Sequence, residues 1–311
     1  MRIEFLLCGE PTDAFLSQGA IFRRQLDALG GDYEAARLVF SLGTLTPAPL
    51  PARWLPYYDR IEVRYADPAD VAARGIDAQC HLLWEALDPA ADVSIICDAD
   101  TLPLRAFPPA LLNEVVATGA IYGAMAHYPP PLDHVGSQPV ESPATQEALW
   151  QVLGDQVIGR PIVLDHAYSL LRPSPPVPFY INHGVILGRP DVLKRVFTVM
   201  KNVMPRLKEV LFNDFSDQLA ITLAVTEADL PTRELPLRYN YPNDPVADSL
   251  HPEELAEVVV MHYLRTEYFD RHSIFHDSDA FRRFLDAELT GSNAVFQSHV
   301  RGLTGGEFPF P

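Results

Sequence analysis

Short apolar runs alternate with amphipathic stretches along the first third of the chain. The runs have the length and β-branched content of buried strands, whereas the stretches between them repeat apolar residues at helical spacing. The pattern predicts strands at residues 2–9, 36–42, 61–65 and 93–97, and helices at residues 14–29 and 69–87. Strands and helices in this order form mainly parallel sheets, so we expect an α/β fold with helices on the faces of the sheet.

The same pattern returns in the second half of the chain, after a proline-rich interruption. It predicts strands at 119–126, 179–187 and 258–262, helices at 190–203 and 279–289, and a further helix that begins near 213–218. The glycine- and proline-containing end, 302–311, is expected to be a loose tail.

The interruption itself covers residues 127–178 and has one helical patch near 145–157. A segment of this length inside a compact domain is typical of a functional lid or an acceptor-binding region. An ordered surface loop with no function is the alternative.

Composition narrows the class of partner. The net charge of -17 and the pI near 4.9 argue against a nucleic-acid or anionic-membrane partner, because such partners require a basic surface. An acidic protein that handles phosphates needs a metal or a few placed cations. No apolar run reaches the length of a transmembrane span, and the first residues do not resemble a signal peptide. Three cysteines without metal-type spacing fit free thiols in a reducing compartment, so we expect a cytoplasmic protein.

Two carboxylates, Asp98 and Asp100, follow the predicted strand at 93–97, and Pro103 marks where regular structure must stop. The carboxyl ends of strands form the edge of an open α/β sheet where ligands bind. Oxygen ligands in this arrangement suit a hard divalent cation such as Mg²⁺ or Mn²⁺. Asp is also common after strands as a turn former or helix N-cap, which is the structural alternative.

With these elements in order, the chain resembles GT-A-type nucleotide-sugar glycosyltransferases, and is most similar to the family of glycogenin and the bacterial lipopolysaccharide galactosyltransferases. The motifs that carry the resemblance are Asp13-Ala14-Phe15 with Gly19-Ala20, Cys97-Asp98-Ala99-Asp100-Thr101-Leu102, Asn182-His183-Gly184-Val185, Asp217-Gln218, and His262 after a valine run. Their order across residues 2–265 matches the order in that family.

The resemblance implies a single large GT-A domain over residues 1–276, followed by a C-terminal helix and tail at 277–311. It implies that Asp98, Asp100 and His262 hold Mn²⁺ or Mg²⁺, with the imidazole favouring Mn²⁺. The metal would bind the diphosphate of a nucleotide-sugar donor, a UDP-sugar being favoured, for transfer with retention. The acceptor, whether glycan, lipid-linked or protein, is left open.

Other site residues each have two interpretations. Asp217 and Gln218 would face the anomeric carbon or hold sugar hydroxyls, or they only begin a helix. Asn182 would contact the sugar or mark a turn. Phe15 would lie near the nucleotide base or pack in the core, and Arg74 would meet the diphosphate or lie on the surface.

Three other functions use parts of the same pattern. An inverting transferase would need a carboxylate base, for which Asp214 and Asp217 are candidates. A haloacid-dehalogenase-like phosphatase would use Asp98 as a phosphoryl-accepting nucleophile, although its motif follows the first strand of that fold. A non-catalytic nucleotide-sugar-binding protein would keep the metal site without turnover. A nucleotidyltransferase would need a glycine-rich phosphate loop, and only Gly9-Glu10-Pro11 stands near residue 9.

Overall fold

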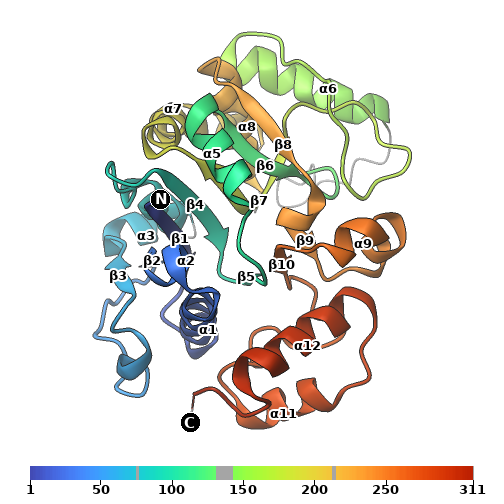
Figure 1. Ribbon diagram of the computed structural model, residues 1–311. Helices are drawn as coiled ribbons and strands as arrows, with labels where there is room; N and C mark the ends of the chain where they lie inside the picture. The colour runs from blue at the N-terminus through green and yellow to red at the C-terminus, as the bar shows by residue number, and fades with distance from the viewer. Residues whose placement is uncertain (75–76, 131–142, 212–214, 311) are drawn as a thin grey trace.

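A twisted sheet runs through the middle of the molecule (Figure 1). The computed structural model describes residues 1–74, 77–130, 143–211 and 215–310, without the side chains of 74–80 and 143–145. Among these residues, seven strands form the main sheet in the order β3-β2-β1-β4-β7-β6-β8. Their bounds are β1 Ile3–Gly9, β2 Arg37–Leu42, β3 Glu62–Tyr65, β4 Val93–Asp98, β6 Ile121–Met125, β7 Ile181–Gly188 and β8 Thr232–Leu235.

The sheet is mainly parallel, as the sequence predicts. β3, β2, β1 and β4 pair in parallel, and so do β6 and β8. β7 is antiparallel to both of its neighbours, β4 and β6. Because of this reversal, the start of β7 lies beside the carboxyl end of β4, so that Asn182 and His183 meet Asp98 at one edge.

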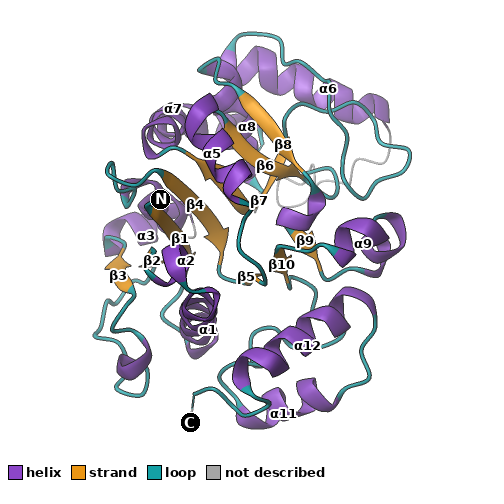
Figure 2. Ribbon diagram, in the orientation of Figure 1, coloured by secondary structure: helices purple, strands orange, loops and turns teal. Residues whose placement is uncertain are grey.

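The two faces of the sheet carry separate apolar layers, because successive side chains of a strand point to opposite faces. Phe5, Phe40 and Ile95 pack on one face with α1, α5 and the C-terminal helices, while Leu6 and Ile96 pack on the other with α4, α7 and α8. Figure 2 shows helices on both sides of the strands. The helices are α1 Asp13–Leu29, α2 Gly31–Glu34, α3 Pro68–Arg74, α4 Asp77–Glu85, α5 Pro109–Thr118, α6 Pro143–Leu153, α7 Pro190–Val210, α8 Ser216–Glu227, α9 Pro245–Leu250, α10 Pro252–Ala256, α11 Ser278–Asp286 and α12 Gly291–Thr304.

A second, small sheet closes the carboxyl edge of the first. Within the described ranges it consists of β5 (Thr101–Pro103), β10 (Val260–His262) and β9 (Tyr241–Pro242). β10 is antiparallel to β5, with His262 opposite Thr101, and parallel to β9. This pairing brings the end of the late apolar run to the turn that follows β4.

The prediction that residues 302–311 form a loose tail is wrong. Its first residues belong to α12, and the end of the chain returns to the core, where Phe310 is only 9% exposed. The Phe310 ring packs edge-on against Trp54 and Tyr57, with centroids 5.5 and 4.9 Å away. Glycine and proline suggested an unstructured end, but the apolar partners that fix it lie some 250 residues earlier, outside any local pattern.

The predicted helix at 69–87 corresponds to α3 and α4, on either side of residues 75–76, which lie outside the description. In the proline-rich segment, α6 continues into one π-helical turn, Gly154–Ile158, and Trp150 is fully buried, with its ring centroid 5.3 Å from that of Tyr180. Residues 131–142 of that segment are outside the described ranges, and its role as a lid or acceptor region stays a prediction. No helix within those ranges combines the length and hydrophobicity needed to cross a membrane.

Candidate metal and donor site

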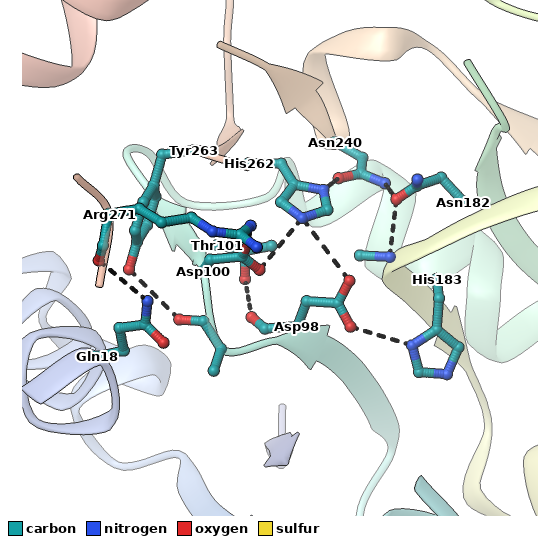
Figure 3. Close-up of polar contacts among 12 residues, drawn as sticks. Gln18, Asp98, Asp100, Thr101, Asn182, His183, Asn240, His262, Tyr263 and Arg271 are labelled. Atoms are coloured by element: carbon teal, nitrogen blue, oxygen red, sulfur yellow. Dashed lines mark hydrogen bonds and ion pairs between the residues drawn. The ribbon is translucent and has the colours of Figure 1, made fainter. Parts of the chain in front are cut away.

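Three predicted ligands meet where the two sheets join (Figure 3). Asp98 is the last residue of β4, Asp100 lies in the turn before β5, and His262 ends β10. The Thr101 hydroxyl donates to the Asp98 carbonyl oxygen at 2.7 Å and closes this turn. The Tyr263 amide donates to the Asp100 carbonyl oxygen at 3.0 Å, which ties the turn to the end of β10.

The ligand atoms are close enough to share one ion. His262 Nε2 lies 3.7 Å from Asp98 Oδ2 and 3.3 Å from Asp100 Oδ1, and one atom from each residue falls within 4.8 Å of the others. The side chain of His262 is 6% exposed and that of Asp98 is 32% exposed, so the cluster opens to solvent on the Asp98 side. Two carboxylates and an imidazole at this separation form a donor set for Mn²⁺ or Mg²⁺ with room for further oxygen ligands.

A chain of hydrogen bonds fixes which nitrogen of His262 faces the carboxylates. The Gly184 backbone amide donates to Asn182 Oδ1 at 2.9 Å, and Asn240 Nδ2 donates to the same oxygen at 2.8 Å. Asn240 Oδ1 therefore faces His262 Nδ1, at 3.0 Å, and can only accept. Nδ1 must carry the proton, which leaves the Nε2 lone pair free for a metal ion.

Gly184 allows β7 to approach this histidine. A Cβ atom at that position would lie 2.5 Å from His262 Nδ1 and 2.7 Å from Asn240 Oδ1, where ordinary contact begins at 3.4 Å. The Asn-x-Gly pattern is therefore explained by close packing against His262, a reason that differs from a turn. Gly184 and Asn240 therefore contact the Nδ1 side of His262 and fix the ring, while Nε2 faces the carboxylates.

Two basic side chains of the protein lie against the carboxylates of Asp98 and Asp100. Arg271 forms an ion pair with Asp100 Oδ2, and His183 Nδ1 lies 3.1 Å from Asp98 Oδ1. Burial would raise the pKa of Asp100, but the charges of His262 and Arg271 lower it to about 2. Burial would lower the pKa of His183, but its hydrogen bond to Asp98 raises it to about 9. Burial would also lower the pKa of His262, but the negative charge of Asp100 outweighs this effect and raises that pKa above its ordinary value.

The other predicted donor-site residues surround the cluster at different depths. Gln218 is buried at the start of α8, where its Oε1 accepts from the His183 amide at 2.7 Å and its Nε2 donates to the Tyr180 hydroxyl at 3.1 Å. Asp217 is half-buried in the first turn of α8 and adds to the charge around His183. Their contact with a sugar stays a prediction, and any sugar contact of Asn182 falls to its Nδ2, since both acceptor positions of Oδ1 are taken.

Phe15 lies in α1, half-buried, with its ring against Gly9 at the end of β1 and edge-on to His272, 6.4 Å between centroids. It is thus at the same sheet edge as Asp98, and its contact with a base stays a prediction. Arg74 ends α3, but its side chain lies outside the description, and so does Asp214, the alternative base.

Asn240 is a site residue that sequence reasoning missed. It precedes β9 in a stretch without apolar periodicity, between a short 3₁₀ turn and Tyr241, and its side chain is fully buried. No signal in the sequence marks this asparagine, because it stands in an irregular segment where neither spacing nor composition indicates which side chain points inward.

Comparison with known proteins supports the fold. The galactosyltransferase LgtC, solved in complex with donor and acceptor sugar analogs, superposes with a TM-score of 0.56 at 16% identity over 99% of this chain and 97% of that one. The bifunctional glycosyltransferase WbbM gives a TM-score of 0.51 at 11% identity over 85% of this chain, which spans 46% of the WbbM chain. No protein-family model and no curated protein matches the sequence. The chain has the GT-A glycosyltransferase fold that the sequence predicts.

Proposed function

We propose that this protein is a metal-dependent glycosyltransferase that moves a sugar from a nucleoside diphosphate sugar, with a UDP-sugar as the favoured donor, to an acceptor not yet identified. The observation that carries the proposal is the cluster of Asp98, Asp100 and His262 at the carboxyl edge of a GT-A sheet. A divalent cation there would bind both phosphates of the donor and stabilise the charge of the leaving diphosphate.

The protein's own residues would orient this cation and the donor. Asn240 holds His262 with Nε2 towards the carboxylates, and the Thr101 hydroxyl keeps the turn after Asp98 closed. Gln218 and the half-buried Asp217 lie one strand away, at the start of α8, where a donor sugar attached to the bound diphosphate would reach. The proposal includes a retaining outcome, which the resemblance to the glycogenin and galactosyltransferase family implies, and Mn²⁺, which the presence of an imidazole ligand favours.

The phosphatase alternative is not favoured by this arrangement. A nucleophilic aspartate must be free to attack phosphorus, whereas Asp98 has His183 on one oxygen and His262 near the other. In addition, the phosphatase motif is expected after the first strand, whereas Asp98 ends β4, and the fold is similar to that of glycosyltransferase structures.

The experiment is a donor panel with matched variants. The protein is incubated with Mn²⁺ and UDP-, GDP- or ADP-sugars, and the nucleoside diphosphate released is measured. Metal binding is measured separately by calorimetry. We expect one donor class to release nucleoside diphosphate, and Asp98→Asn and His262→Ala to lose both this release and Mn²⁺ binding. Asp191→Asn should behave like the wild type, because Asp191 is exposed in the first turn of α7 and pairs with Arg189, the residue before that helix. Mn²⁺ binding that survives both site substitutions, or no release and no nucleotide binding with any donor, would refute the proposal. A phosphoaspartate at Asp98 would support the phosphatase instead.

A further inference from the structure

Arg271 has an unusual position for a surface cation. Its guanidinium forms an ion pair with Asp100, one of the three proposed metal ligands (Figure 3). Asp100 thus has His262 near Oδ1 and Arg271 on Oδ2, and its side chain is 16% exposed. Arg271 therefore pairs with a carboxylate oxygen to which a divalent cation would also bind.

The backbone of Arg271 contacts α1. Gln18 Nε2 donates to its carbonyl oxygen at 3.4 Å, and the ring of the next residue, His272, lies edge-on to Phe15. The side chain can therefore leave Asp100 while its backbone keeps its place over the site. A long, flexible arginine side chain allows such a movement.

Binding of a divalent cation would weaken the pair between Arg271 and Asp100. The cation brings two positive charges to the same carboxylate, in a partly buried site where charges are poorly screened. It also removes the negative charge that holds the guanidinium. A phosphorylated ligand on the cation would offer the displaced guanidinium a new anion, and planar bidentate pairing suits phosphate oxygens.

We propose that Arg271 is an internal counter-ion that exchanges Asp100 for the diphosphate of the donor when the divalent cation binds. In the protein alone it neutralises Asp100, and in the loaded protein it becomes a donor-positioning residue. The inference rests on the proposed metal site. It makes metal binding and diphosphate binding respond in opposite directions to removal of the same side chain.

Arg265 provides a matched control from the same segment. Its Nε and Nη2 both donate to Asp244 Oδ2, at 3.0 and 2.7 Å, and Asp244 caps α9. Replacing Arg265 by methionine changes the net charge by the same amount as replacing Arg271, but it leaves the ion pair on Asp100 in place.

The test compares wild type, Arg271→Met, Arg271→Lys and Arg265→Met by calorimetry, first with Mn²⁺ alone and then with UDP at saturating Mn²⁺. In Arg271→Met we expect Mn²⁺ alone to bind roughly tenfold more tightly, since the competing cation is gone, and UDP with Mn²⁺ to bind roughly tenfold more weakly. Arg271→Lys keeps the positive charge but not the planar guanidinium, so its affinities for Mn²⁺ and for UDP should lie between those of the wild type and Arg271→Met. Arg265→Met stays close to wild type in both titrations.

Hydrogen exchange of the peptide at 265–276 gives a second readout. Because only the side chain of Arg271 moves in this proposal, we expect the backbone protection of this peptide to be the same in the wild type with and without Mn²⁺ and in Arg271→Met, and a loss of protection on adding Mn²⁺ would overturn the side-chain exchange. Unchanged or weaker Mn²⁺ binding in Arg271→Met, or equal effects in Arg265→Met, would overturn the exchange while leaving the metal site standing. Absence of Mn²⁺ binding in the wild type would overturn both.

Discussion

Gly184→Ala tests the metal site without touching a ligand. The added Cβ would lie 2.5 Å from His262 Nδ1, so the ring would have to retreat by about 0.9 Å to reach the 3.4 Å at which ordinary contact begins. Metal–ligand distances tolerate deviations of only about 0.2 Å. We therefore expect the imidazole to be lost or misplaced, with Mn²⁺ affinity falling about 10- to 100-fold, the range seen when groups supporting a ligand are removed.

Crowding should also lower the free energy of unfolding of Gly184→Ala, by about 1–3 kcal/mol, because the site is already packed. The control is Gly302→Ala, on an exposed helical position of α12 where a Cβ meets nothing within 4 Å. That variant should keep wild-type metal affinity and gain about 0.5–1 kcal/mol of stability. Titration calorimetry with Mn²⁺ and urea denaturation measure the two quantities. If Gly184→Ala binds Mn²⁺ within about twofold of wild type, the argument that β7 presses His262 into place is wrong.

Three further outcomes follow from the packing and charges. Phe310→Ala should lower the free energy of unfolding in urea by about 2–3 kcal/mol, because its ring is buried, and an unchanged value would show that the chain end does not dock in solution. Arg37→Met should destabilise by about 2–3 kcal/mol because the buried Glu4 carboxylate loses its charged partner at 2.6 Å and keeps the hydrogen bonds from Ser94 and Asp88, and adding Glu4→Gln should recover part of the loss. Burial, with the nearby positive charges, lowers the pKa of His127 to about 3 from an ordinary 6.5, so its neutral form contributes stability that is complete above pH 6.5 and is lost as the pH falls towards 3, up to about 5 kcal/mol. His127→Gln should flatten the pH dependence of unfolding in that window, and a parallel curve would contradict the assignment.

The elements predicted well are those whose burial is written into a local pattern. The five residues before Asp98 are all buried and, apart from Ser94, all apolar, because both faces of a central strand are covered, and the structure gives β4 at Val93–Asp98. The direction of β7 could not be predicted, because apolar periodicity does not distinguish parallel from antiparallel pairing. The docking of Phe310 was missed for a related reason, since its partners are distant in sequence.

The three candidate metal ligands could be predicted because they lie at or just after the ends of strands, where a polar residue interrupts an apolar run. Asp98, Asp100 and His262 are all of this kind, and the structure brings them together. Their supporting contacts were not predictable. Asn240 and Arg271 reach the cluster from irregular segments, where neither spacing nor composition indicates which side chain points inward.

The small sheet of β5, β9 and β10 has a consequence for synthesis of the protein on the ribosome. It joins the two halves of the proposed metal site across the chain, with Ala99 and Tyr263 in contact although they are 164 positions apart. A nascent chain that has already folded β1 to β4 still lacks His262, and such long-range pairing forms late. The growing polypeptide therefore cannot capture a metal ion at this site until most of its length has emerged, and a prematurely terminated product would have the acidic turn alone.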